Sequence, residues 1–315
     1  MTTELREAPP ADLAPVAFQM PPVLHNARGD LRRAGFEFEY AGIGVEASAD
    51  LVRDVFGGDL TILGPAVRKV GTPIGDFSVE IDSAVVKDKR YEVAMRAVGL
   101  NPDNWNTDPL EAALTGVLST WVPFEVGTPP IPLDRLSLLD DLRERLRLAG
   151  AKGTRTSFRY AFGMHINPEL TSDDAADVRD HLRAFLLLLP WLSGRVDVDL
   201  TRRVMPFINP FPIDYARLVL QPDYPADAGR LIDDYLKFNP TRNRPLDLLP
   251  VLAHLDKDRV MHRVEDPHLV KPRPAYHYRL PNCLIDEPGW TIAREWNTWV
   301  AVERLAADKP QLAEM

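Results

Sequence analysis

Residues 35–39 read Gly-Phe-Glu-Phe-Glu, a short run that carries two acids between apolar residues. Apolar and polar residues alternate in it, which is typical of a β-strand whose two faces meet different surroundings. The carboxylates of Glu37 and Glu39 therefore project from one face, about 6.5–7 Å apart along the strand. Each can hold a different metal ion of a shared cluster, although a lone Glu-x-Glu is more often a solvated strand face.

Four later runs repeat this alternation and add acids, histidines and an amide. Their polar residues are Glu80 and Asp82, then Glu125, then His165 and Asn167, and finally His277 and Arg279. Carboxylates gathered on one sheet face are costly unless a cation lies among them, so the set predicts a divalent metal. A neutral imidazole is a good metal ligand, and an amide can hold a carbonyl or phosphate oxygen. Non-catalytic roles stay open for three of these residues. His165 can be a hydrogen-bonded structural residue, Asp82 a turn cap and Glu125 a surface acid beside a turn.

Arginines form a second group late in the chain: Arg242, Arg244, Arg273 and Arg279. A guanidinium matches the geometry of phosphate and carboxylate groups through paired hydrogen bonds. Any one of these arginines alone is best explained as a surface charge. Several of them beside a face of carboxylates indicate a pocket for phosphate transfer.

Composition describes an ordinary globular protein and excludes several classes. The chain has 315 residues, 45% hydrophobic and 26% charged, with a formal net charge of -9. This charge argues against a general nucleic-acid surface, but local arginines and metal still allow a nucleotide. The single cysteine, Cys283, excludes an internal disulfide and a cysteine-based zinc cluster, and a buried, inert thiol is expected. The N-terminus lacks the pattern of a signal peptide, and the apolar run 184–192 is too short to span a membrane, so we expect a cytoplasmic protein.

Periodicity predicts an α+β fold with a mainly antiparallel sheet and helices packed on one face. Residues 1–24 are expected to form a flexible N-terminal arm, and residues 25–315 a single catalytic domain. Helices are predicted from 48–50 to Gly57, over 108–118, after Pro132 until Gly150, from 171–174 to a break at Pro190, several within 211–254, and over 288–305. Strands are predicted over 60–86, 158–166 and 275–280, besides the first. Trp290, Trp296 and Trp299 are assigned to the last helix, more as core than as a subunit contact.

The order of these motifs resembles the amidoligase family. The motifs are Gly-Phe-Glu-x-Glu at 35–39, Asp82-Ser83, Glu-Val-x-Thr-Pro-Pro at 125–130 and Gly-x-His-x-Asn at 163–167. The similarity extends from about Ala34 to the final helix, and the ordered set is more specific than any one motif. The resemblance implies the catalytic fold of glutamine synthetase and glutamate–cysteine ligase. It also implies ATP-dependent joining of a carboxylate to an amine through an acyl phosphate, with Mg²⁺ or Mn²⁺ bridging the phosphates.

The resemblance also implies roles for particular residues. Glu37 and His165 would hold one ion, and Glu39 and Glu125, with Glu80 or Asp82, another. Arg279, in Tyr-Arg-Leu-Pro-Asn, resembles the arginine of glutamine synthetase's Glu-x-Arg-x-Pro-Asp strand, and with Arg273 it would bind ATP. Arg242, Arg244 and Arg273 are candidates for clamping phosphate.

One departure from the glutamine synthetase pattern concerns the metal. His277 stands where that strand has its glutamate, and Asn282 replaces the aspartate. Histidine can still ligate a metal, but the site loses a negative charge, which leaves the number of ions open. An amine larger than ammonia, such as an amino acid or a peptide amine, is a reasonable hypothesis.

Two other functions stay open at this level. Acids with His165 can activate water in a metal-dependent hydrolase without any nucleotide. A non-catalytic scaffold of the same fold would explain the substitution at His277. Small-molecule or peptide carboxylates and amines are the expected partners, with no nucleic acid and no membrane; the oligomeric state is left open.

Overall fold

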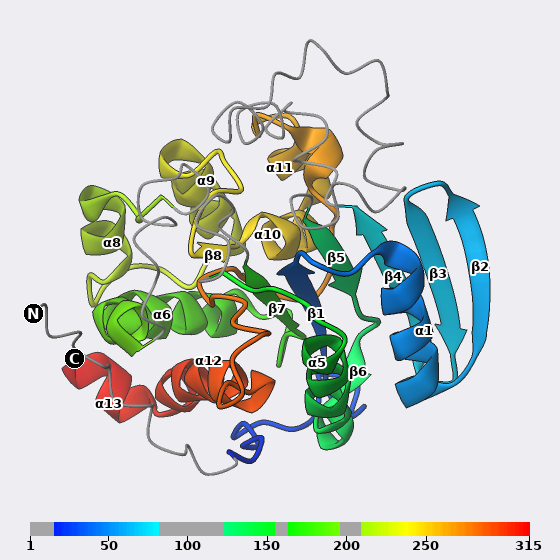
Figure 1. The fold of residues 1–315 in the computed structure, drawn as a ribbon. Helices are drawn as coiled ribbons and strands as arrows, with labels where there is room; N and C mark the ends of the chain where they lie inside the picture. The colour runs from blue at the N-terminus through cyan, green and yellow to red at the C-terminus, as the bar shows by residue number, and fades with distance from the viewer. Residues whose placement is uncertain (1–15, 82–122, 155–162, 196–208) are drawn as a thin grey trace, which may run out of the picture.

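An antiparallel sheet of nine strands forms the centre of the protein (Figure 1), in a computed structural model that describes residues 16–81, 123–154, 163–195 and 209–315. The strand order is β2-β3-β4-β5-β1-β7-β9-β8, and β6 pairs with the start of β1. The strands are β1 Arg33–Tyr40, β2 Asp59–Gly64, β3 Val67–Thr72, β4 Gly75–Ile81, β5 Phe124–Gly127, β6 Ile131–Pro132, β7 Met164–Pro168, β8 Leu246–Asp247 and β9 His277–Tyr278. The α+β class and the antiparallel sheet predicted from the alternation are confirmed.

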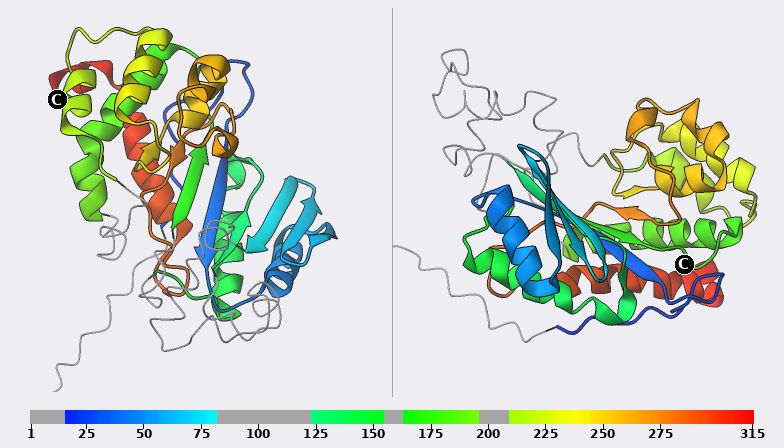
Figure 2. Two further views of the ribbon diagram at one scale, coloured as in Figure 1. Left: turned by 90° about the horizontal axis from the view of Figure 1, so that it is seen from above. Right: turned by 90° about the vertical axis from the view of Figure 1, so that its right-hand side faces the viewer.

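The helices divide into two groups around this sheet. Their bounds are α1 Val45–Phe56, α5 Leu138–Leu148, α6 Ala175–Arg195, α8 Ile213–Val219, α9 Ala228–Phe238, α10 Leu249–Leu255, α11 Lys257–Met261, α12 Ile292–Ala307 and α13 Lys309–Glu314, with 3-10 turns at Leu133–Arg135 and Pro267–Leu269. Helices α1, α5 and α12 cover one face of the sheet, and α6 packs against α12 (Figure 2). Helices α9, α10 and α11 rise at the β8 end on the other side, so the prediction of helices on one face describes only the first group.

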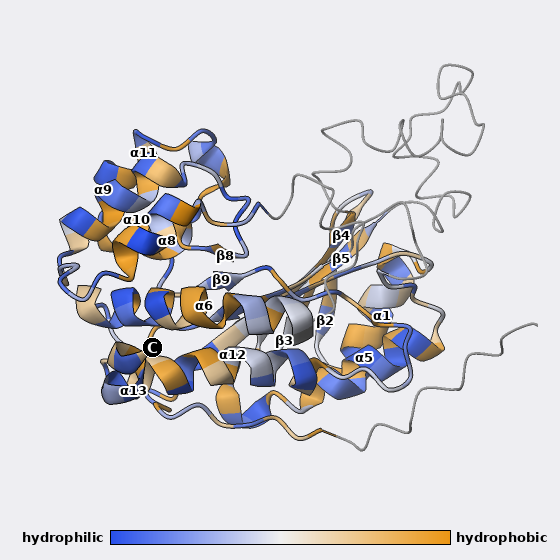
Figure 3. Cartoon of the chain, turned by 90° about the vertical axis from the view of Figure 1, so that its left-hand side faces the viewer, coloured by the Kyte–Doolittle hydropathy of each residue, from blue (hydrophilic) through white to orange (hydrophobic). Residues whose placement is uncertain are grey.

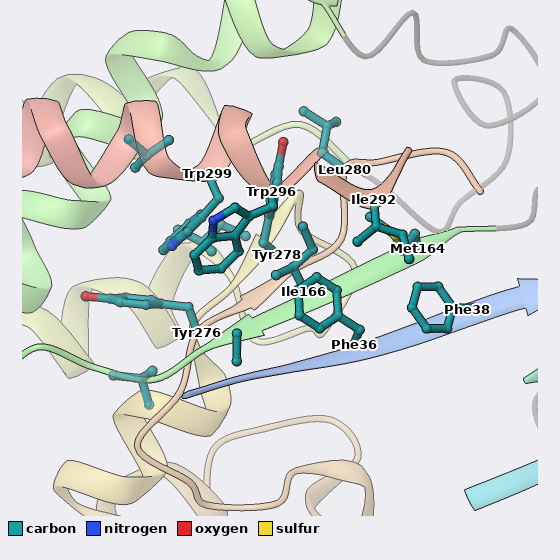
Figure 4. Close-up of a cluster of buried hydrophobic side chains, with 14 of the residues drawn as sticks. Phe36, Phe38, Met164, Ile166, Tyr276, Tyr278, Leu280, Ile292, Trp296 and Trp299 are labelled. Atoms are coloured by element: carbon teal, nitrogen blue, oxygen red, sulfur yellow. The ribbon is translucent and has the colours of Figure 1, made fainter. Parts of the chain in front are cut away.

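The main core lies between the sheet and α12. Phe36 on β1 and Ile166 on β7 point toward Trp296 of the helix, and Phe38 lies near Met164 and Ile292 (Figure 4). The rings of Phe36 and Trp296 have centroids 6.2 Å apart, and both residues are fully buried. The tryptophans are therefore core residues, as predicted. Burial of this aromatic surface is the main force that holds α12 on the sheet.

Helix α5 shows how local sequence specifies an element. Leu139, Leu142 and Leu146 recur at helical spacing and are fully buried, while charged residues lie between them. Figure 3 shows this mixture of apolar and polar residues along the helices. The helix ends before Gly150, whose φ of 100° favours glycine.

A buried ion pair connects the start of the sheet to α12. Arg32 donates to both carboxylate oxygens of Glu303, at 2.7 and 2.8 Å, and both side chains are about 1% exposed. Arg32 also donates to the carbonyl oxygen of Val23, and the indole of Trp296 donates to that of Gln19. The described part of the predicted arm, residues 16–24, thus lies along α12.

Several predicted boundaries are wrong, each for a local reason. Helix α1 begins at Val45 rather than at Ser48, whose hydroxyl bonds back to the carbonyl oxygen of Gly44 instead of capping the helix. Helix α6 continues through Pro190 to Arg195, and Leu186 and Leu192 on either side of the proline are buried. Trp290 precedes α12. The strand predicted over 275–280 is limited to His277–Tyr278, and its partner β8 lies in a region interpreted as helical. The predictions for 82–86, 108–118 and 158–162 lie outside the described residues.

Candidate active site

Polar residues of adjacent strands share the sheet face that points away from α12. Glu37 pairs in register with His165 on β7 and with Gly127 on β5. Two residues further along β1, Glu39 pairs in register with Glu125 on β5. Glu125 pairs in turn with Glu80 on β4. Since side chains alternate across a strand, these residues face away from Phe36 and Phe38. The register therefore brings together acids that lie up to 88 positions apart in the chain.

Glu37 is the centre of a hydrogen-bonded chain on this face. One of its carboxylate oxygens lies 2.9 Å from Nδ1 of His165, and the other accepts from the amide of Asn167 at 3.0 Å. The carbonyl oxygen of Asn167 accepts in turn from Arg273 at 2.8 Å. A cation, an amide, a carboxylate and an imidazole are thus joined in one line.

Space is kept beside Glu37 by a glycine. Gly127 lies opposite Glu37, and a Cβ atom added there would lie 2.6 Å from the hydroxyl oxygen of Ser78. A side chain at this position would crowd the face where the polar groups converge.

His277 and Asp247 complete the group from the other end of the sheet. Nε2 of His277 lies 3.8 Å from the Glu37 carboxylate, and Nδ1 lies 3.2 Å from Asp247. Glu37, His165 and His277 each offer one ligand atom within 4.8 Å of the others, and within the described ranges no other trio of acids, histidines or cysteines does so. This trio is the candidate metal site.

The carboxylates Glu39, Glu125 and Glu80 form a second acidic row beside the trio. Glu39 accepts a hydrogen bond from the backbone amide of Gly163 at 2.7 Å and lies 3.7 Å from Nε2 of His165. All three are partly buried. Oxygen ligands of this type suit a hard cation such as Mg²⁺. Asp82, the other predicted ligand, lies outside the described residues.

The protonation states follow from burial and from the neighbouring groups. Burial opposes ionisation of Glu37, but interactions with His165 and His277 outweigh it and hold the pKa of Glu37 well below its usual value. Burial lowers the pKa of His165, so its imidazole is neutral at pH 7 and has a lone pair to offer. Burial also opposes the charge on Asp247, yet the hydrogen bond from His277 keeps the pKa of Asp247 below its usual value. Near neutral pH Glu37 and Asp247 are therefore ionised and His165 is neutral, which are the states in which such groups bind a metal or orient a ligand.

Strands β1, β5, β7, β8 and β9, which carry the candidate site, lie within a segment that matches a known family. A family model described as "putative amidoligase enzyme" matches residues 30–301. The chain belongs to the amidoligase family. No curated protein and no solved structure matches it.

The predicted arginines occupy different places in the structure. Arg273 contacts Asn167 as described, and Arg279 donates to the backbone oxygen of Arg242 at 2.5 Å. Burial lowers the pKa of Arg273 and of Arg279, and nearby carboxylates, among them Glu37, offset only part of this effect. Both guanidinium groups stay charged at neutral pH. Nε of Arg242 lies 3.6 Å from Asp247. These three cations therefore lie on or beside the acidic face.

Arg244 has a different environment. Its guanidinium donates to the side chain of Asn239 at 2.7 Å and to the carbonyl oxygens of Pro210 and Phe238 at 2.9 and 3.2 Å. These contacts tie together the loops around α9. We therefore assign a structural role to Arg244 and leave it out of the phosphate site.

Asp247 is the functional candidate that the sequence did not reveal. It lies in Pro245–Leu248, a stretch interpreted as part of a helical region, and it is fully buried. An acid directly between two leucines was the available signal, because a buried acid requires a partner. Here the partner is His277, on the neighbouring strand β9.

Among the helices that the structure describes, none has both the length and the apolar content that a membrane crossing requires.

Proposed function

We propose that this amidoligase joins a carboxylate to an amine in an ATP-dependent reaction. The observation that carries the proposal is the single sheet face on which Glu37, His165 and the acidic row meet the guanidinium of Arg273. Carboxylates with cations among them fit a metal-bound polyphosphate better than they fit an uncharged ligand. The family membership supports a ligase.

In the proposed reaction the substrate carboxylate attacks the γ-phosphate of ATP, which gives an acyl phosphate and ADP. The amine then attacks the acyl carbon and loses one proton, and the C–O bond to phosphate breaks, so that hydrogen phosphate leaves as the amide bond forms. Metal ions held by Glu37, His165 and His277 and by Glu39, Glu125 and Glu80 would neutralise the charge of the phosphates.

The protein's own residues bind and orient the reactants. Arg273 and Arg279 present guanidinium groups to a phosphate or to the substrate carboxylate. Asn167 fixes both Arg273 and Glu37 through its two amide atoms, so the cation and the carboxylate keep one relative position. Such positioning is the main contribution a protein makes to phosphoryl transfer. We propose the glutamine synthetase-type catalytic fold for this sheet and a cytoplasmic location for the protein.

Calorimetric titration with ATP, with and without Mg²⁺, tests the proposal. We expect metal-dependent binding that Glu39→Gln abolishes, because the change is nearly isosteric and removes one ligand charge. Glu314→Gln, at an exposed position near the C-terminus, is the matched control and should bind as the wild type does. Absence of ATP binding under both conditions would contradict the ligase and favour the hydrolase or the inactive scaffold.

A panel of amines tests the acceptor once a carboxylate substrate is found. We propose an amino acid or peptide amine, because His277 and Asn282 depart from the glutamine synthetase pattern, so that the resemblance does not carry over the ammonia-specific chemistry of that enzyme. Ammonia as the best acceptor would contradict this choice.

A further inference from the structure

The candidate metal trio has an unusual balance of ligand atoms for a magnesium enzyme. Glu37 offers an oxygen, whereas His165 and His277 each offer an imidazole nitrogen, all within 4.8 Å of one another. Mg²⁺ demands oxygen ligands and keeps several waters, while imidazole suits zinc, iron, cobalt and related ions. The neighbouring row of Glu39, Glu125 and Glu80 offers only oxygen.

The side chain of His277 is buried, and one of its ring nitrogens faces the carboxylate of Glu37. It is 2% exposed, and its Nε2 atom has no hydrogen-bond partner among the described residues. A buried nitrogen without a partner costs free energy, so such an atom needs a reason. Nε2 lies 3.8 Å from the Glu37 carboxylate, on the side where the trio converges.

Asp247 determines which nitrogen of His277 carries the proton. One of its carboxylate oxygens lies 3.2 Å from Nδ1 of His277, and the other accepts from the backbone amide of Leu249 at 3.0 Å. A carboxylate accepts hydrogen bonds, so Nδ1 donates, and in the neutral ring the lone pair is then on Nε2. Metal-binding histidines are usually oriented in this way by a carboxylate on the other ring nitrogen.

We propose that Glu37, His165 and His277 form a site selective for a divalent transition-metal ion over Mg²⁺, with Asp247 as the positioning residue of His277. The proposal refines the metal requirement of the proposed ligase and in that respect rests on it. The all-oxygen row is then left for Mg²⁺ with the nucleotide, so the two ions of the centre differ in kind.

Titration of the full-length, metal-free protein with CoCl₂, MnCl₂ and MgCl₂, without nucleotide, tests the selectivity. We expect Co²⁺ to bind on the order of 100-fold more tightly than Mg²⁺. Electron spin-echo spectroscopy of the Mn²⁺-loaded wild type should show coupling to imidazole nitrogen. Equal affinities for Co²⁺ and Mg²⁺, or a Mn²⁺ signal without nitrogen coupling, would overturn the proposal without any variant.

Two substitutions assign the effect to named residues. His277→Glu should lower the Co²⁺ to Mg²⁺ affinity ratio by at least about tenfold, because it replaces nitrogen by oxygen. His262→Glu, at an exposed histidine, is the matched control and should leave the ratio unchanged. Asp247→Asn should weaken Co²⁺ binding by about 10- to 100-fold. A ratio in His277→Glu equal to that of the wild type, in protein whose circular dichroism shows it folded, would overturn the assignment.

The outcomes separate this inference from the proposed function. Selective Co²⁺ binding in a protein that does not bind ATP would support the metal site and contradict the ligase. ATP binding with Mg²⁺ in a protein without Co²⁺ selectivity would support the ligase and overturn the inference.

Discussion

The two faces of strand β1 lie only one residue apart and serve opposite purposes. Phe36 and Phe38 are buried against α12, whereas Glu37 and Glu39 take part in the polar network of the other face. The apolar face gains free energy from burial. The polar face brings like charges side by side and leaves Nε2 of His277 without a hydrogen bond among the described residues. The apolar face therefore stabilises the fold, and the polar face carries the candidate chemistry. The stability gained on the apolar face offsets the cost of the polar groups on the other.

The largest effect is expected on the apolar face. Phe36→Ala should lower the free energy of unfolding by about 3–5 kcal/mol, because it leaves a cavity under Trp296. Urea denaturation followed by tryptophan fluorescence measures it. A loss below about 1 kcal/mol would mean that this face does not dominate stability.

A charge buried on the apolar side should also matter greatly. Glu303→Gln leaves the buried guanidinium of Arg32 without its counter-ion, and we expect a loss of about 3 kcal/mol. Thermal unfolding of this variant beside Glu314→Gln, an exposed control, gives the difference. Identical melting temperatures would show that Arg32 reaches solvent or another acid.

On the polar face the effect should depend on the metal. Glu125 lies between Glu39 and Glu80 in the acidic row. Glu125→Gln should therefore reduce the extra stability that Mg²⁺ provides, because it removes one of the carboxylates proposed to hold the ion. Calorimetric melting with and without Mg²⁺ measures this difference. An increase in melting temperature on adding Mg²⁺ equal to that of the wild type would contradict the division between the faces.

The smallest effect belongs to an acid whose charge is already paired. Hydrogen bonds from Arg259 and Arg263 lower the pKa of Asp233 to about 2 from 3.8. A lowered pKa in the folded state means a stabilising contribution that is present above pH 3.8 and is lost as the pH falls toward 2. Asp233→Asn should cost less than about 1 kcal/mol at pH 7, because the pair is exposed to solvent, and clearly less near pH 2, where the carboxyl of Asp233 is half protonated. Urea denaturation at the two pH values tests this, and an equal cost at both would contradict the pairing.

Much of the candidate site was predictable because strand alternation is local. The spacing of Glu37 and Glu39, and of His165 and Asn167, places each pair on one face whatever the rest of the chain does. The ordered motifs led to the amidoligase family, which residues 30–301 confirm. Helix α5 was predictable in the same way from its leucines and Gly150.

The pairing of His277 with Asp247 was not predictable, because both lie in strands of two residues. Such a short strand has no periodicity, and its identity depends on the neighbour to which it hydrogen-bonds. The prolines around Asp247 favoured an interpretation as broken helices. Arg244 and Arg242 likewise received the same prediction from the sequence. Only the structure shows that Arg244 donates hydrogen bonds to Asn239 and to loop carbonyl oxygens.

The sequence by itself determined the alternation of the strands, the α+β class and the family, since these depend on residues close together in the chain. The tertiary structure decided which strands are neighbours and in which register, and hence that Glu37, His165 and His277 converge and that Asp247 orients His277. The physical reason is that register is set by burial of the apolar face against α12, a contact made across the whole chain. The same packing that buries Phe36 and Trp296 thus places the ligand atoms on the opposite side of the sheet.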